Sequence, residues 1–285
     1  MMLEFADLQL LHPRDGAVLV EHANFGVQRG EVVVIVGAAG VGTSRLVAAA
    51  LGEATPSEGT ISVLGRDVAK LRRSSLRLLR RRVGVVPQDL SLLDDRSAQL
   101  NVVLPLEIDG VPRTVSVARA AEVLAQMGLD DEASLPVDCL SASARQRVAV
   151  ARALVRAPEL ILADHPTSMQ DAAGTERICE AFYEAASQGA SIVIFSRDPA
   201  LRSIAERNRW RQLALVDGRL CPLGEVTLDG RSIDDVLIGI ETAPVHVPAM
   251  PPPPPPAAVD ATDDVIDSIP NLVHFPISAR TAGVG

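Results

Sequence analysis

The chain has 285 residues, 47% of them apolar and 22% charged, with a formal net charge of −9. These proportions are typical of a globular protein and exclude a chain that is disordered throughout. No uninterrupted apolar segment approaches the ~18 residues that a bilayer span needs, and charged residues interrupt the first twenty, so we expect a cytoplasmic protein without a secretory leader. The negative charge argues against nucleic acid as a partner. Three widely spaced cysteines predict neither a disulfide framework nor a metal site.

The first predicted elements are two strands, residues 3–9 and 18–27, which a turn at 14–16 joins into an antiparallel flank. A third, wholly apolar strand at 32–36 runs into glycines and then into a helix at 45–50. A strand that leads through a Gly-rich turn into a helix is typical of a phosphate-binding loop. The glycines let backbone N–H groups surround the anion, and the helix dipole favours negative charge there.

The spacing of this loop matches G-x-x-x-x-G-K-[ST] at every position but one. Gly37, Gly40 and Gly42 supply the flexible backbone, and Ser44 supplies a hydroxyl for Mg²⁺. Thr43 stands where the pattern has the lysine that reaches the β- and γ-phosphates. The loop therefore predicts a phosphate site without its main cation, and the alternative is a tight turn of purely structural use.

Strands and helices alternate through the rest of the chain, which predicts an α/β fold with a mostly parallel, helix-covered sheet. The predicted strands are 60–64, 83–86, 160–164 and 191–195, and the predicted helices are 74–82, a helical stretch over 105–140, 142–154 and 175–187. Gln88 follows the second of these strands, and Asp164 ends the third, where a carboxylate can hold Mg²⁺ or its water. Ser141 is a predicted helix N-cap.

Arginines concentrate in one place, at positions 72, 73, 77, 80, 81 and 82. The preferred interpretation is a solvated helix face, and the alternative is a contact with anionic lipid.

Together these motifs resemble the ATP-binding subunits of ABC transporters over residues 3–220, in the same order and spacing. Residues 79–106 are most similar to the cell-division ATPase FtsE and to the related lipoprotein-release and macrolide-export ATPases. The resemblance implies a P-loop NTPase (ABC ATPase) domain over residues 1–241, with a mostly parallel sheet, an antiparallel β flank and an inserted helical subdomain at about 105–157. It also implies an integral membrane permease-like partner (FtsX-like) that docks on the insert, at the inner face of the cell membrane.

By the same resemblance the chain binds ATP and Mg²⁺ at two composite sites of a head-to-tail homo- or heterodimer, each pairing one phosphate loop with the other subunit's signature helix. The implied nucleotide-binding residues are His12 (beside adenine), Gly37, Gly40, Gly42, Thr43, Ser44, Gln88 and Asp164, with Ser44, Gln88 and Asp164 at the metal. The implied signature residues are Ser141, Ala142 and Ser143.

Departures from the family pattern fall on the chemistry. Thr43 replaces the loop lysine, and Ala142 and Ser143 replace two signature glycines, whose Cβ atoms would crowd a γ-phosphate. His165 stands at the catalytic glutamate's position and Arg197 at the switch histidine's. The sequence thus predicts a non-catalytic or very weak ATPase that binds nucleotide weakly and serves as a regulatory or scaffolding subunit.

Two alternatives stay open. One is an active ATPase that energises a transport or cell-division complex, with His165 as base and Arg45 or Arg197 as substitute cation. The other is a soluble nucleotide-sensing adaptor. Residues 242–285 form a Pro-rich tail that we expect to be disordered, with the proline run 251–256 as a stiff spacer or as a docking site for a tail-binding partner.

Overall fold

The computed structural model describes residues 1–37, 42–223, 227–228 and 231–232. The predicted tail, residues 242–285, lies outside these residues. Among the helices of the described part, none is long and apolar enough to cross a membrane.

A six-stranded sheet forms the centre of the fold, with the strand order β10-β9-β3-β8-β7-β6. Every neighbouring pair is parallel except β9 and β10, which the turn at Asp217-Gly218 joins as a hairpin. The α/β class with a mostly parallel sheet is therefore confirmed. The strands are β3 (Val32–Gly37), β6 (Val83–Val86), β7 (Leu160–Asp164), β8 (Ser191–Phe195), β9 (Arg211–Val216) and β10 (Arg219–Pro222).

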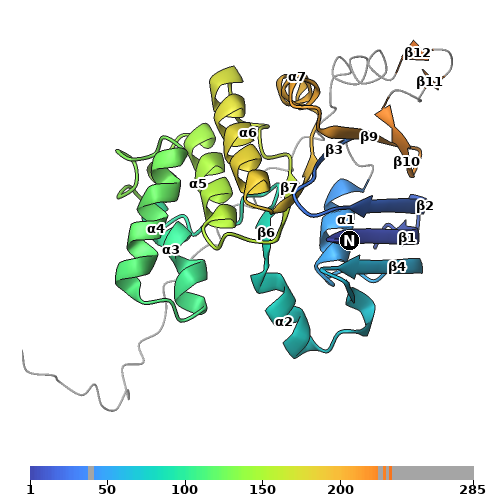
Figure 1. Ribbon diagram of the computed structural model, residues 1–285, viewed down its shortest axis with the longest axis horizontal. Coiled ribbons are helices and arrows are strands. Elements are labelled where there is room, and N and C mark those ends of the chain that lie inside the picture. The colour runs from blue at the N-terminus through green and yellow to red at the C-terminus, as the bar shows by residue number, and fades with distance from the viewer. Residues whose placement is uncertain (38–41, 224–226, 229–230, 233–285) are drawn as a thin grey trace, which may run out of the picture. The chain divides into compact units, whose positions relative to one another are not determined.

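The antiparallel flank is a separate four-stranded sheet of order β2-β1-β4-β5, which also confirms its prediction. Its strands are β1 (Leu3–Leu11), β2 (Val18–Val27), β4 (Glu58–Val63) and β5 (Arg66–Asp67). Phe5 and Phe25 pair across β1 and β2 with ring centroids 5.5 Å apart. Helix α1 (Thr43–Ala50) lies against this sheet (Figure 1), and Leu46 and Val47 join its buried core to that of the parallel sheet.

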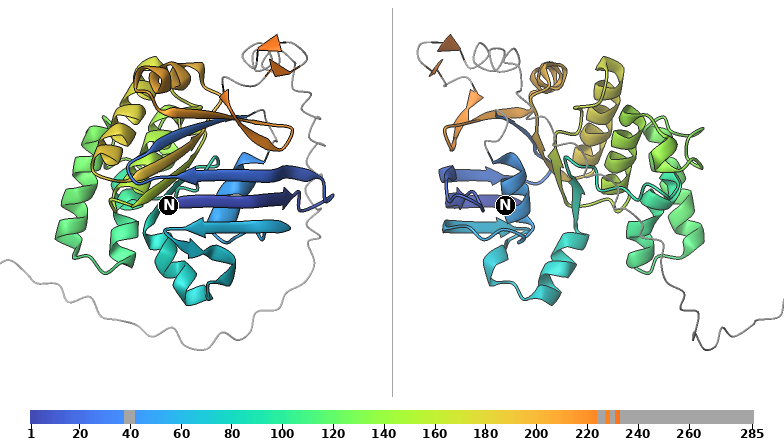
Figure 2. Two further views of the ribbon diagram at one scale, coloured as in Figure 1. Left: turned by 45° about the vertical axis from the view of Figure 1, so that its right-hand side comes forward. Right: turned by 180° about the vertical axis from the view of Figure 1, so that it is seen from behind.

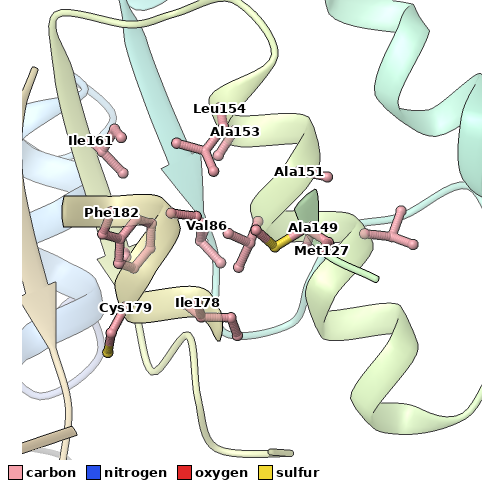
Figure 3. Close-up of a cluster of buried hydrophobic side chains, with 14 of the residues drawn as sticks. Val86, Met127, Ala149, Ala151, Ala153, Leu154, Ile161, Ile178, Cys179 and Phe182 are labelled. Carbon is pink, nitrogen blue, oxygen red and sulfur yellow. The ribbon is translucent and has the colours of Figure 1, made fainter. Parts of the chain in front are cut away.

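Most helices cover the other face of the parallel sheet, as Figure 2 shows from two sides. They are α3 (Ala98–Ile108), α4 (Arg113–Gln126), α5 (Ala142–Leu154), α6 (Ala172–Ser187) and α7 (Pro199–Arg207), while α2 (Arg73–Arg81) lies apart before β6. Phe182 and Ile178 of α6 pack with Ile161 of β7 and Ala149 of α5 in a dry core (Figure 3). This core packs against the parallel strands, and the candidate site lies at their carboxyl ends.

Helix α3 corrects the prediction that the helical stretch begins at residue 105. It begins at Ala98, with Ser97 as N-cap, because Val102, Val103 and Leu106 bury one face. Pro105 lies inside the helix, and its carbonyl accepts a bond of 2.6 Å from Arg156. A proline in the sequence reads as a helix boundary, but the buried apolar residues on both sides of it outweigh the lost backbone hydrogen bond.

Other boundaries moved less. Helix α6 begins at Ala172, three residues earlier than expected, because the side chain of Asp171 caps the backbone N–H of Gly174 at 2.7 Å. Helix α7, which the sequence analysis did not predict, begins at Pro199 with Asp198 as N-cap. The predicted N-cap of α5 is confirmed, since Ser141 Oγ accepts from the Ala144 N–H at 3.1 Å.

Candidate functional site

Three side chains that the sequence assigns to Mg²⁺ come together at the carboxyl edge of the parallel sheet. Ser44 lies in the first turn of α1, Gln88 follows β6, and Asp164 is the last residue of β7. Ser44 Oγ donates to Asp164 Oδ2 and lies 3.5 Å from Gln88 Oε1. The fold thus brings an hydroxyl, an amide oxygen and a carboxylate within reach of one point.

Asp164 is 2% exposed, and its second oxygen, Oδ1, has no hydrogen-bond donor among the described residues. A buried carboxylate oxygen without a donor is costly unless a cation or water occupies the space before it. Mg²⁺ binds oxygen ligands, and it needs only a few of them from the protein because it keeps several waters and binds substrate phosphates. Ser44, Gln88 and Asp164 therefore fit a Mg²⁺ ion that would neutralise the phosphates of a bound nucleotide.

The phosphate loop is described in part. Gly37 ends β3, and Gly42 caps α1 with φ +101°, a left-handed backbone that favours glycine, while Gly40 lies outside the described residues. Thr43 opens the helix, so a short hydroxyl side chain occupies the position of the missing lysine. His12 lies beyond β1, where its Nδ1 is 2.7 Å from Asp15 Oδ1, and it does not line the pocket around Ser44.

That pocket has a volume of about 600 Å³ and lies between α1, α2 and the segment after β6. Ser44, Gln88 and Asp164 line one end of it. The remainder is lined by mostly apolar side chains with a few charged ones, namely Val47, Ala48, Leu51, Glu53, Arg80, Val85, Pro87 and Asp89. Such walls suit contact with a protein segment better than contact with phosphates, because they offer few donors.

His165 and Arg197 line a different pocket, of about 330 Å³, together with Thr167, Ser196 and Asp198. The two pockets share no lining residue, although Asp164 and His165 are adjacent in the chain. His165 adopts φ 52°, a left-handed backbone that is uncommon outside glycine. Its Nε2 lies 3.9 Å from Asp164 Oδ1, too far for a hydrogen bond.

Burial lowers the pKa of His165, and the positive charge of Arg197 lowers it further, while the carboxylate of Asp164 opposes the shift. The imidazole is consequently neutral at pH 7 and cannot supply the negative charge that a glutamate would place there. Within the described part of the chain, the Arg197 side chain makes no ion pair or hydrogen bond. The site therefore holds a neutral ring and a cation at the positions where the resemblance implies a carboxylate and a histidine.

The signature residues begin α5. Ser141 is exposed and uses its hydroxyl as the helix cap, and Ala142 is also exposed. Ser143 instead turns inward, where its Oγ is 3.0 Å from Gln170 Oε1 and its carbonyl accepts from Gln170 Nε2 at 2.9 Å. The Ser143 side chain is thereby tied to the loop that follows β7.

Gln146 is a positioning residue that the sequence analysis did not single out. It is 1% exposed, and its Nε2 donates to the His165 carbonyl and to Ser168 Oγ, both at 3.0 Å. Its Oε1 accepts from the Met169 N–H at 2.9 Å and from Gln170 Nε2 at 3.1 Å. The amide thus fixes the loop carrying His165 to the start of α5, and the one signal in the sequence was a glutamine on the buried side of a helix.

Comparison with known proteins identifies the family to which this chain is similar. The sequence pattern of the ABC transporter family matches residues 20–168. The chain belongs to the ABC transporter family. It is 35% identical over 210 residues to the methionine import ATP-binding protein MetN of Mesorhizobium japonicum, covering 73% of this chain and 56% of that protein. It is 34% identical over 235 residues to the MetN of Nocardia farcinica, covering 82% and 67%. The chain spans little more than half the length of the first of these relatives.

Solved ABC structures share the fold. The dimeric, post-hydrolysis ATP-binding cassette MJ0796 bound to ADP and Pi superposes with a TM-score of 0.71 at 26% identity, covering 81% of this chain and 99% of that one. CbiO1 from Clostridium perfringens, part of the ABC transporter complex cbiONQ, gives 0.67 at 26% identity, covering 77% and 86%. The ABC ATPase fold predicted from the motifs is confirmed, and ATP with Mg²⁺ is the ligand pair of this family.

Proposed function

We propose that this ABC family member is the ATP-binding subunit of a membrane complex and that it hydrolyses ATP very slowly or not at all. It binds Mg-nucleotide weakly through the phosphate loop, Ser44 and Asp164. It acts as a regulatory or scaffolding subunit at the inner face of the membrane, where it dimerises and docks on a permease-like partner.

One observation carries the proposal: the residue after Asp164 is a half-buried, neutral histidine that lines a pocket that Ser44 does not line. Hydrolysis needs a base that faces the attacking water beside the γ-phosphate. Thr43 cannot supply the cation that the loop lacks, and loss of one such charged group costs about 3 to 4 kcal/mol of transition-state stabilisation. Several lost groups together leave little rate.

Docking on a membrane partner is supported by the mostly apolar walls of the 600 Å³ pocket beside Gln88. The finer assignment is a prediction from residues 79–106, which point to an FtsE-like subunit with an FtsX-like partner. The relatives reported above are named for methionine import, so an importer subunit is the competing branch.

The test is steady-state ATP hydrolysis by the purified chain, compared with Asp164→Asn, which removes the carboxylate at the metal position. We expect the two rates to agree within the error of the assay. The matched control is Asp171→Asn, which removes a carboxylate on the next segment that caps α6 and lines neither pocket. Turnover clearly above that of Asp164→Asn but equal to that of Asp171→Asn would establish the active-ATPase alternative.

A further inference from the structure

Helix α2 carries arginines that the fold leaves without partners. Arg80 donates to the Leu51 carbonyl at 2.8 Å, and Arg82 donates to Glu159 at 2.8 Å. The side chains of Arg72, Arg73 and Arg77 are exposed, and none of them makes a hydrogen bond or an ion pair within the part of the chain that the structure describes. The arginine cluster is therefore divided between structural cations and free ones.

Two of the free arginines share one face of the helix with Arg81. Arg73, Arg77 and Arg81 are spaced four residues apart, so they lie above one another along α2, although Arg81 also has an ion-pair partner. Leu78 lies beside them and is 59% exposed, although Leu79 on the opposite side is buried. A single exposed leucine is common on protein surfaces, so Leu78 matters here only together with the charges and apolar side chains around it.

Helix α3 extends this face. Arg81 Nε lies 3.2 Å from Asp109 Oδ1, which joins the end of α2 to the end of α3. Ile108, adjacent to Asp109, is 57% exposed, and Leu104, one turn earlier, is 37% exposed. We call the surface formed by Arg72, Arg73, Arg77, Leu78, Arg81, Leu104 and Ile108 the α2 face; Figure 1 shows α2 set apart from the other helices.

The nearby carboxylates do not cancel its charge. Asp109 also binds Arg156 at 2.8 Å, Glu107 binds Arg113 at 2.5 Å, and Glu53 lies 3.8 Å from Arg80. Each acid thus has its own arginine, so the three free cations remain as local net charge. The chain as a whole has a net charge of −9, so an anionic surface repels most of the molecule and attracts it only at a positive face such as this one.

We propose that the α2 face binds the anionic phospholipid headgroups of the membrane surface. Free arginines at such a surface each strengthen partitioning about fivefold, and leucine or isoleucine side chains enter the boundary between headgroups and acyl chains. Arg80 of the same helix lines the 600 Å³ pocket beside Gln88, so a partner docked there would hold the α2 face near the bilayer. The inference rests on the proposed function only for the location of the chain at a membrane. The isolated chain is expected to bind lipid without the partner.

The test is co-sedimentation of the full chain with vesicles of phosphatidylcholine containing increasing phosphatidylglycerol, at low and at high salt. The wild type is expected to bind phosphatidylglycerol vesicles at low salt, to bind less as salt screens the charges, and not to bind pure phosphatidylcholine. Combined Arg72→Gln, Arg73→Gln and Arg77→Gln is expected to weaken binding about 100-fold. Leu78→Ala, which keeps every charge, is expected to weaken it several-fold.

The matched control replaces three exposed arginines elsewhere, Arg14, Arg66 and Arg119, with glutamine, and it should bind as the wild type does. Equal loss in this control would overturn the proposal, since net charge and not the α2 face would then govern binding. So would a wild type that ignores phosphatidylglycerol, or an α2-face variant that keeps vesicle binding but loses a co-purified membrane protein. Circular dichroism of every variant establishes that the helices are intact.

Discussion

At the scale of single residues, His165 shows how one side chain can change both chemistry and stability. Its position follows from the strand before it, since the buried run 160–164 predicts the edge of the sheet where Asp164 and His165 lie. Its environment could not be read from the sequence, because Gln146, which binds its carbonyl, and Arg197, whose charge acts on its ring, come from other elements. The phosphate loop, in contrast, was predictable, because its residues are contiguous in the sequence and its glycines allow the backbone to surround a phosphate.

The lowered pKa of His165 predicts an acid-sensitive stability. Between its depressed folded pKa and the unfolded value of 6.5, the unfolded chain binds more protons, so the free energy of unfolding falls as the pH falls. His165→Asn removes this dependence while tolerating φ 52°. Urea unfolding at about pH 7.5 and 5.5 should therefore show a smaller acid loss for the variant than for the wild type.

His22 supplies a control of opposite sign. Its ring N–H donates to the carboxylate of Asp7, which raises the pKa of His22, so its contribution to stability is present below 6.5 and is lost as the pH rises through the folded pKa. His22→Asn should accordingly destabilise the chain more in acid than in base. If His165→Asn lost as much stability in acid as the wild type does, the His165 ring would be solvated, and the lowered pKa that we attribute to its burial would be wrong.

At the scale of elements, strands were easier to predict than helix ends. The strands of the parallel sheet are continuous apolar runs because helices or the second sheet cover both of their faces. The start of α3 was wrong because the helical pattern was taken to begin at Pro105, and α7 was missed although Leu201, Ile204 and Ala205 bury one face of it. Contacts between elements, such as that of α5 with the loop after β7, leave no pattern in either segment alone.

That contact predicts a large effect for a conservative substitution. Gln146→Leu keeps the volume of the side chain but removes one of the two hydrogen bonds to the His165 carbonyl and leaves the Met169 N–H without its partner. We expect a loss of about 1 to 3 kcal/mol in the free energy of unfolding, measured in urea. Gln126→Leu is the control, since it breaks only an exposed bond of 2.7 Å to Glu184 and should change stability by less than about 0.5 kcal/mol. Equal effects would mean that the loop is held by other contacts.

At the scale of the whole molecule, the fold of an ABC ATPase is retained, and our proposal is that the groups that would perform the chemistry are replaced. Ser44, Gln88 and Asp164 meet as the motifs predict, but Thr43, His165, Arg197, Ala142 and Ser143 each depart from the family pattern. If sites form between two subunits as the resemblance implies, a competent partner would not rescue this chain. The partner's phosphate loop would face the altered signature of this chain, and the partner's signature would face the altered phosphate loop of this chain.

Stepwise repair tests this reasoning. Thr43→Lys alone should strengthen Mg-ATP binding by about 1.5 to 3 kcal/mol in calorimetry, because it restores charge-assisted bonds to the phosphates, but it should not restore turnover. Adding His165→Glu and Arg197→His rebuilds one half of a site that still meets Ala142 and Ser143. Only the set that also includes Ala142→Gly and Ser143→Gly should hydrolyse ATP. Because Ser143→Gly also frees Gln170, the double glycine variant without the other changes controls for lost stability. Robust hydrolysis by Thr43→Lys alone would contradict the composite-site argument, whereas a fully repaired chain that binds Mg-ATP tightly yet stays monomeric and inert would overturn the head-to-tail dimer.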